Sequence, residues 1–199
     1  MQMEQLAEAV LGRIFVELEA SGRHVHLTCE QARQLFGHGL TPQRELSQPG
    51  QYVARERVRV VGPKGSFENV AVLGPERPEA QVEISFTDGR LLGITPPVRL
   101  SGDVKNSPGV VLEGPEGKLT LEHGVIVARR HMHITPEDAA RHGVKDKQIV
   151  RLQTYTERPV IFEGVSVRVS PEYATRVHLD YDEANACGFR SGDLGRILP

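Results

Sequence analysis

Two short histidine motifs are the residues of this chain best suited to chemistry. The sequence reads RHVHLT at 23–28 and RHMHIT at 130–135. A β-strand points alternate side chains to one face, so the two imidazoles of each H-x-H pair project together, about 6.6 Å apart along the strand. A single pair of this kind is typical of half-exposed strand histidines. Two copies in matching context indicate a duplicated metal-binding unit.

Each half of the sequence also offers a third candidate ligand. QVEI at 81–84 corresponds to RVHL at 176–179, and S-G-D occurs at both 101–103 and 191–193. The first correspondence places Glu83 and His178 at one position of the repeat. Alone, Glu83 would be read as an exposed strand carboxylate and His178 as a core imidazole, but the repeat favours ligation. The expected metal ligands are His24, His26, Glu83, His131, His133 and His178.

Three nitrogen or oxygen ligands with one open position are typical of catalytic zinc, whereas structural zinc has four protein ligands. Such a zinc can polarise a carbonyl, activate water or hold a thiolate. Arg77, on a loop before Glu83 that contains Gly and Pro, could offer a bidentate fork to phosphate or be a solvated loop arginine. Three classes remain open: a zinc-dependent acyl or phosphoryl transferase, a dinuclear zinc hydrolase of thioesters or phosphoesters, and a non-enzymatic zinc-binding barrel.

The elements that must position these residues are short strands and capped helices. Thr28 and Thr135 are typical N-caps, and they predict a helix directly after each H-x-H strand. A polar turn is expected at 88–89 and an irregular excursion at 40–56. With 20 Gly, 13 Pro and short β-branched runs, the composition favours a turn-rich, mainly β protein.

The net charge and the cysteine content limit which binding partners and which cellular compartment are expected. Lys and Arg number 24 against 26 Asp and Glu, so the net charge of −2 gives no case for nucleic acid or an anionic membrane as partner. The apolar runs are too short to span a bilayer, and the chain does not open like a secretory signal. Cys29 and Cys187 lack C-x-x-C spacing, which suggests reduced thiols in the cytoplasm.

Five motifs, in order, resemble the PduL-type phosphate acyltransferases (phosphotransacylases), which exchange an acyl group between coenzyme A and inorganic phosphate. They are RHVHLT, GPxRPxxQVEIS, PVRLSGDVKNSPG, RRHMHITPEDA and HLDYDEANACGFRSGD. The resemblance runs from about Ile14 to the C-terminus. It implies two small β-barrels capped by short helices, related by a pseudo-twofold duplication and exchanging strands, with two zinc ions at their junction.

The resemblance also implies roles for individual residues. His24, His26 and Glu83 would hold the zinc that takes the coenzyme A sulfur, and the three histidines of the second half would hold a second zinc near the phosphate. Arg77 is expected to be catalytic and to contact phosphate together with Ser101 and Arg168. No residue is assigned to the coenzyme A nucleotide, and the preferred acyl length is left open. Arg176-Val177 departs from the acidic or apolar pair expected before His178.

The expected organisation has a helical segment at 1–12, a first-half barrel from 23–36 plus 57–128, and a second-half barrel from 13–22 plus 129–199. Paired barrels with exposed sheet surface favour a homodimer. The amphipathic pattern in residues 1–12 fits a docking helix, or a peptide that binds a shell protein of a bacterial microcompartment. Because that pattern is short and weak, the expected location is the free cytoplasm.

Overall fold

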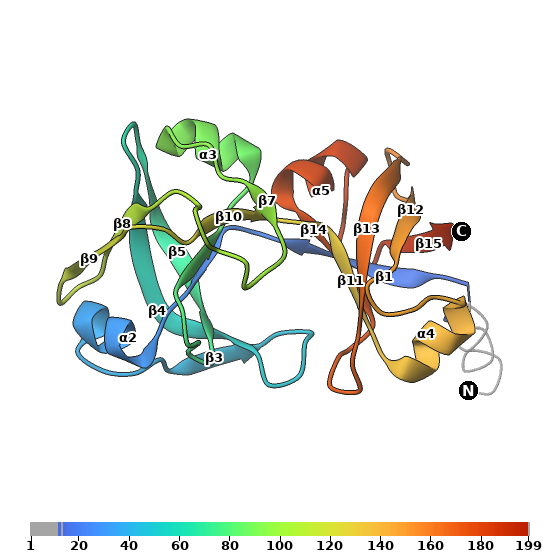
Figure 1. Cartoon of the computed structure of the whole chain (residues 1–199), viewed down its shortest axis with the longest axis horizontal. Helices are drawn as coiled ribbons and strands as arrows, with labels where there is room; N and C mark the ends of the chain where they lie inside the picture. Colours follow the sequence, from blue (N-terminus) through green and yellow to red (C-terminus); the bar gives the residue numbers. More distant parts are fainter. Residues whose placement is uncertain (1–11, 13, 199) are drawn as a thin grey trace. The chain divides into compact units, whose positions relative to one another are not determined.

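The structure is a computed structural model that describes residue 12 and residues 14–198 (Figure 1). The helical segment expected at 1–12 therefore lies almost entirely outside the described residues. The described part contains strands β1–β15 and helices α2–α5, so the prediction of a mainly β protein is confirmed. Among the described helices, none has the length and apolar character needed to span a membrane.

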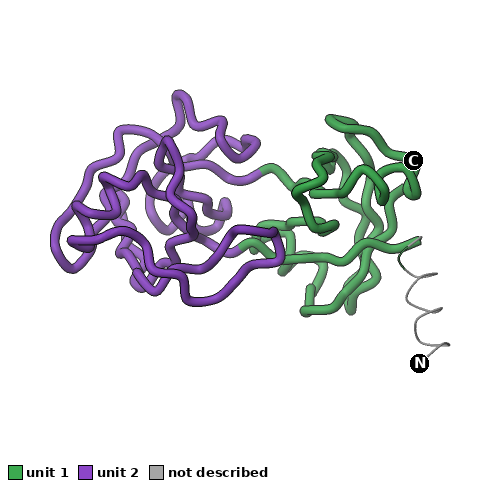
Figure 2. Tube along the Cα trace, turned by 90° about the horizontal axis from the view of Figure 1, so that it is seen from below, with its two compact units in different colours: residues 1–21, 129–199 green, residues 22–128 purple. Residues whose placement is uncertain are grey.

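The chain divides into two compact units, coloured separately in Figure 2. The first-half unit comprises residues 22–128, and the second-half unit comprises residues up to Ser21 together with those from Arg129 onward. Each unit has a hydrophobic core of its own, centred on Val25, Leu35 and Val82 in the first and on Met132, Leu152 and Val167 in the second. Each can therefore be described by itself.

The second-half unit is a closed barrel. Its six strands follow the order β1 (Val16–Ser21), β14 (Arg176–Asp180), β11 (His131–Ile134), β13 (Ile161–Val169), β12 (Ile149–Tyr155) and β15 (Leu194–Leu198). Helices α4 (Pro136–His142) and α5 (Tyr181–Cys187) follow β11 and β14. Closure removes the free sheet edges that a small β unit would otherwise expose.

The first-half unit is a nine-stranded sheet curved into a half-barrel. Its order is β7 (Val98–Arg99), β10 (Val125–Ala128), β6 (Gln81–Glu83), β2 (His24–His26), β5 (Ser66–Gly74), β4 (Tyr52–Val61), β8 (Val110–Glu113) and β9 (Lys118–Leu121), and β3 (Pro42–Glu45) pairs with β4. Helices α2 (Cys29–Phe36) and α3 (Phe86–Leu92) follow β2 and β6.

Two local predictions in the first half were wrong. Residues 40–56, expected to be an excursion between strands, contain β3 and the start of β4, because all four residues of Pro42–Glu45 are exposed on an edge strand that needs no apolar face. The turn expected at 88–89 lies inside α3. There Asp88 is the N3 residue of a capping box, and the short helix is specified by its cap rather than by apolar periodicity.

The two units exchange strands, as the fold prediction required. Strand β1 leads along the chain into β2 of the first-half unit, yet it pairs with β14 and β15 of the second (blue among red strands in Figure 1). Strand β10 leads into β11 of the second-half unit, yet it pairs with β6 and β7 of the first. Each third-ligand strand, β6 or β14, thus lies between an H-x-H strand of its own unit and an exchanged strand.

Every strand that carries a candidate ligand ends in the same way. An N-cap residue follows the strand, accepts a hydrogen bond from the backbone N–H of the N3 residue and starts a short helix. These caps are Thr28, Ser85, Thr135 and Asp180. Since an N-cap typically contributes about 1 kcal/mol, four of them fix where the ligand strands stop.

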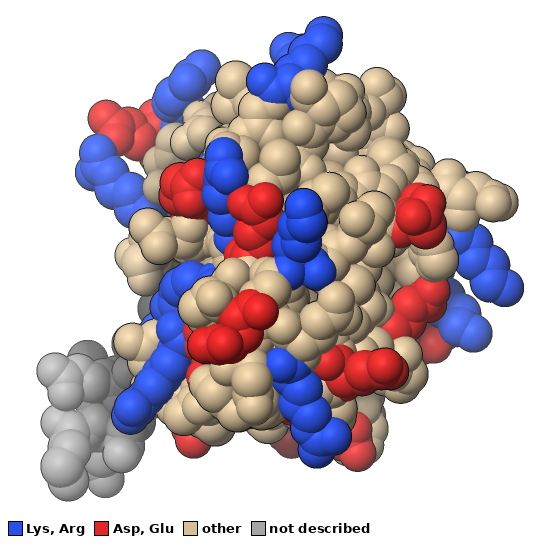
Figure 3. Space-filling view, turned by 90° about the vertical axis from the view of Figure 1, so that its left-hand side faces the viewer, with Lys and Arg blue, Asp and Glu red and all other residues tan. Residues whose placement is uncertain are grey.

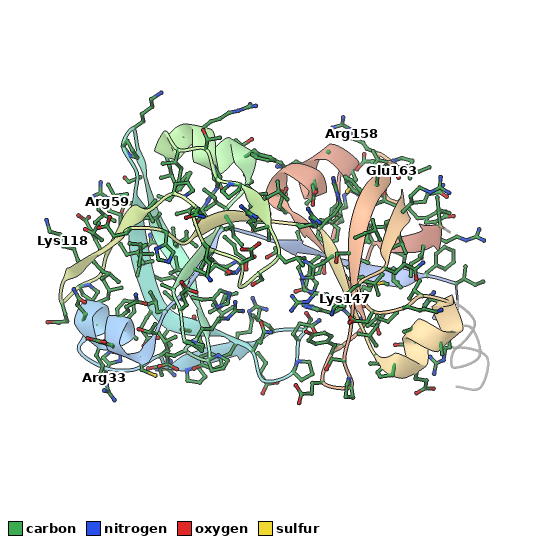
Figure 4. The ribbon with its side chains drawn as sticks, viewed as in Figure 1. Arg33, Arg59, Lys118, Lys147, Arg158 and Glu163 are labelled. Atoms are coloured by element: carbon green, nitrogen blue, oxygen red, sulfur yellow. The ribbon has the colours of Figure 1, made fainter. Side chains whose placement is uncertain are left out.

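Charged side chains lie mainly on the outside. Arg33, Lys118 and Arg158 point away from the ribbon in Figure 4, and all three are exposed. On the face seen in Figure 3, acidic and basic side chains are interspersed, as the near-zero net charge would suggest. Buried histidines and carboxylates are exceptions to this distribution, because burying an ionisable side chain is costly unless it has a partner.

Candidate metal centres

The first-half triad consists of His24 and His26 on β2 and Glu83 on β6. The antiparallel register pairs His24 directly with Glu83, and alternation along β2 places His26 on the same face. All three residues are buried, with His26 only 2% exposed. His24 Nε2 lies 3.6 Å from Glu83 Oε2, and one ligand atom from each residue lies within 4.8 Å of the others.

The second-half triad repeats this arrangement with His131 and His133 on β11 and His178 on β14. The register again pairs the first histidine of the H-x-H motif with the third ligand, here His131 with His178. Their rings stack with centroids 5.1 Å apart, and His133 Nδ1 lies 3.3 Å from His178 Nε2. The structure therefore assembles the six expected ligands into two groups of three.

In both triads, the first histidine of the H-x-H motif forms a hydrogen bond through Nδ1 to a backbone carbonyl oxygen two residues earlier. Nδ1 of His24 lies 2.8 Å from the Gly22 carbonyl oxygen, and Nδ1 of His131 lies 2.8 Å from that of Arg129. Because a carbonyl oxygen only accepts, both Nδ1 atoms donate, so a metal would bind these two histidines through Nε2.

The first-half triad passes a further test of fit to a metal. Nδ1 of His26 is buried without a hydrogen-bond partner among the described residues, which is costly for a ring nitrogen unless it has a ligand. Ligands of a tetrahedral zinc, bonded at about 2.0–2.1 Å, lie about 3.4 Å apart. The shortest separations in the two triads, 3.6 Å and 3.3 Å, are close to this value, and all the ligand atoms of a triad lie within 4.8 Å of one another. Two triads of imidazole and carboxylate donors thus fit zinc.

The pKa values of the two histidines in the first-half triad shift in opposite directions. Burial by itself would lower the pKa of His24, but the Glu83 carboxylate and a hydrogen bond to it raise that pKa above its usual range. Burial, with the nearby His24 and Arg77, lowers the pKa of His26 well below its usual range. His26 is therefore a neutral imidazole at pH 7, the form that binds a metal.

A hydrogen-bond network holds Glu83. Ser101 Oγ donates to Glu83 Oε1 at 3.0 Å and accepts from Arg77 Nη1 at 3.1 Å and from Gln81 Nε2 at 2.8 Å. The Arg77 backbone N–H also donates to the carbonyl oxygen of Leu27, which follows the H-x-H strand, at 2.8 Å. Arg77 and Ser101, both expected at the phosphate, thus lie beside the first-half triad.

Arg168 lies beside the second-half triad. Residue 168 on β13 pairs with His133, and on the opposite side Arg176 of β14 pairs with the same histidine. The Tyr173 ring lies 4.3 Å from the His133 ring, and the Arg168 guanidinium lies 5.9 Å from the centroid of Tyr173. Arg176 also forms an ion pair with Glu17 at 2.9 Å.

Three residues that lie beside the triads were not predicted from the sequence. They are Gln81, Tyr173 and Arg176. Gln81 and Arg176 precede the third ligand by two residues, so strand alternation puts them on the ligand face, and this signal was available in the sequence. Tyr173 lies in the segment between β13 and β14, and its sequence neighbours gave no such signal.

The two cysteines lie outside the triads. Cys29 is exposed at the start of α2. Cys187 is fully buried in the second-half core, where burial raises the pKa of its thiol. A buried thiol with a raised pKa is a poor nucleophile.

Comparison with known proteins shows the family of the chain. The family model for phosphate propanoyltransferase matches residues 17–190. A phosphate propanoyltransferase of Enterococcus faecalis is 52% identical, covering 98% of this chain and 97% of the relative. Those of Listeria monocytogenes and Thermotoga maritima are 51% and 54% identical, covering 98% and 89% of this chain and 93% and 86% of the relatives. This chain belongs to the phosphate propanoyltransferase family and is an acyltransferase of the phosphotransacylase type.

Proposed function

We propose that the enzyme is a zinc-dependent phosphotransacylase with two zinc ions per chain, which moves a short acyl group between coenzyme A and inorganic phosphate. The observation that carries the proposal is the pair of three-ligand clusters, built on equivalent strands in a member of an acyltransferase family. Three ligands at each cluster would leave a coordination position for a substrate. When bound, zinc would supply a Lewis acid that stabilises a thiolate and polarises oxygen.

The two clusters suit different substrate groups. The ligands His24, His26 and Glu83 would leave one open position on a zinc ion, and zinc binds a soft thiolate well. The second-half triad has no carboxylate among its ligands and is flanked by Arg168 and Arg176, so its surroundings favour an anion such as phosphate. We therefore place the coenzyme A sulfur at the first triad and phosphate at the second.

In the proposed reaction a phosphate oxygen attacks the thioester carbonyl carbon. A carbon–oxygen bond forms, the carbon–sulfur bond breaks, and coenzyme A leaves as the thiolate. The planar guanidinium of Arg77, oriented by Ser101, would donate to phosphate or to the oxyanion that develops on the carbonyl. Direct attack is favoured over an acyl-enzyme because the buried Cys187 thiol has a raised pKa and Cys29 lies outside both triads.

The test is release of free thiol from acetyl-CoA before and after dialysis against a strong chelator. We expect phosphate-dependent release, its loss once metal analysis confirms removal, and recovery on adding zinc or cobalt. Full activity in verified metal-free protein would overturn the zinc requirement. Release without phosphate would instead identify a hydrolase, and no release with any short acyl-CoA would leave a binding protein.

Assembly and location complete the proposal. Ile149, Tyr155 and Ile161 are exposed on β12 and β13, where a second copy of the chain could cover them, and we propose a cytoplasmic homodimer. Sedimentation equilibrium should give twice the mass of the 22.0 kDa chain, and a monomer would contradict it. Co-sedimentation of the full chain with microcompartment shells would favour the alternative location.

A further inference from the structure

An arginine stands immediately before each H-x-H motif and reaches the helix that follows the third ligand. In the first-half unit, Arg23 Nη2 donates to Asp88 Oδ1 at 2.7 Å, and the Asp88 side chain is only 3% exposed. Asp88 Oδ2 accepts from the backbone N–H of Ser85, the cap that follows Glu83. The guanidinium of Arg23 also lies 4.2 Å from the centroid of the Phe67 ring on β5.

The second-half unit contains the same arrangement. Arg130 Nη1 donates to Glu183 Oε1 at 2.9 Å, and Glu183 Oε2 accepts from the backbone N–H of Asp180, the cap that follows His178. The guanidinium of Arg130 lies 5.5 Å from the centroid of the Phe162 ring on β13. We call each set of arginine, helix acid and phenylalanine a clamp.

The two clamps occupy equivalent positions in the repeat. Each arginine precedes the first histidine by one residue, and each acid follows the third ligand by five. The strand register pairs His24 with Ala71 and His131 with Ser166, and each phenylalanine precedes that partner by four residues. Chance ion pairs on a surface would not be expected to recur at three matched positions.

The clamps act where the sheet itself holds the triads weakly. Strands β2 and β6 have three residues each, and only three residue pairs join them. Strands β11 and β14 are likewise joined by three pairs. A slip of one residue would turn a ligand to the opposite face of its strand. A charge-assisted bond from one strand to the capped turn after the other opposes that slip.

We propose that Arg23 and Arg130 are positioning residues, each of which holds the third ligand of its triad in register with the H-x-H strand. Among the described residues, the side-chain hydrogen bonds of Arg23 and Arg130 run to Asp88 and Glu183 and not to a ligand of either triad. Their effect on a metal is transmitted through the backbone of the capped turns. The inference rests on the proposed function to the extent that the triads bind metal.

The test measures Co(II) affinity and absorption in proteins that retain one triad. In a His26→Ala background, which leaves the second-half triad, Arg130→Gln should weaken Co(II) binding about tenfold and alter the ligand-field bands. In a His133→Ala background, Arg23→Gln should do the same at the first-half triad. The matched control is Arg158→Gln, which removes an equal charge from an exposed side chain of the same unit outside both triads and should change neither quantity.

A second variant separates positioning from simple destabilisation. Arg130→Gln alone leaves the half-buried Glu183 without its cation, which can impair folding. Arg130→Gln combined with Glu183→Gln leaves no unpaired charge, and it should fold yet bind Co(II) about tenfold more weakly. Arg130→Lys, which keeps the charge but not the fork, should recover part of the loss. Unchanged Co(II) affinity in the folded double variant would overturn the proposal.

Hydrogen exchange in metal-free protein provides a readout that does not depend on the proposed function. Amides of 131–134 and 176–180 should exchange about tenfold faster in the double variant than in Arg158→Gln if the clamp holds the register. If the unaltered protein bound no Co(II) or zinc, the proposal of metal binding would fail. The exchange rates would still show whether the clamp holds the strand register. Equal exchange in both variants would overturn the clamp.

Discussion

The first-half and second-half triads share a scaffold and differ in their surroundings. In both, the first histidine pairs across the ladder with the third ligand, and an N-cap follows that ligand by two residues. The first half then places a carboxylate in a network with Gln81 and Ser101, whereas the second places an imidazole beside Arg168 and Arg176. Duplication supplied the geometry, and a few side chains on the ligand face set the charge.

Removing one candidate ligand should produce the largest loss of acyl transfer, and it tests whether the two triads bind metal independently. His133→Ala leaves two ligands in the second half, too few for tight zinc binding, while the first-half triad is intact. We expect zinc content to fall from two to one per chain and transfer to fall on the order of 10³-fold, as when key charge-stabilising groups are lost. Metal analysis and thiol release measure both, and an unaltered rate would remove His133 from the site.

Arg77 tests whether the first-half network contributes to the reaction. Arg77→Gln removes the guanidinium that donates to Ser101, and we expect transfer to fall by about 10²-fold with zinc content unchanged. Arg77→Lys should be intermediate, since an ammonium cannot form the planar fork. Steady-state kinetics against phosphate measure the effect. The exposed Arg33→Gln is the control, and an equal loss there would refute a specific role.

Glu183, in the second half, should make the free energy of unfolding depend on pH. Burial, reinforced by Asp180, raises its pKa to about 7 from an ordinary value near 4.5. Between those values the folded state keeps a proton that the unfolded state has lost, so the free energy of unfolding should decrease as pH rises from about 4.5 to 7, by at most about 1.4 kcal/mol per pH unit.

Glu183→Gln should lack this decrease. Urea unfolding of both proteins from pH 5 to pH 8 measures the difference between them, in which the other titrating groups largely cancel. Parallel stability profiles would show that Glu183 titrates in its ordinary range.

The cysteines should give the smallest effect. Cys29→Ala and Cys187→Ala should retain turnover, because neither thiol belongs to a triad and the proposed mechanism is direct displacement. Cys187→Ala should lower stability by about 1 kcal/mol, as a small side chain leaves a filled core. Thiol release and thermal unfolding measure these outcomes. Loss of turnover in either variant, with folding intact, would favour an acyl-enzyme.

The grouping of the candidate ligands was predictable from the sequence because repetition and strand alternation are local signals. The H-x-H spacing pointed to His24, the correspondence between the two halves pointed to Glu83 and His178, and Thr28 and Thr135 marked the helix starts. Helix α3 was missed because its seven residues are set by the Ser85 cap. The half-barrel of the first unit and the pairing of Arg23 with Asp88 depend on contacts between segments distant in sequence, for which a single chain carries no local signal.

The reciprocal exchange of β1 and β10 has a consequence for biosynthesis. During translation β1 emerges before its neighbours β14 and β15, which follow the other described strands along the chain. Its backbone donors and acceptors must wait for most of the polypeptide to leave the ribosome, and an unpaired strand is prone to association with other chains. Ribosome-bound fragments that stop before residue 176 should therefore depend on chaperones in a way that the finished enzyme does not.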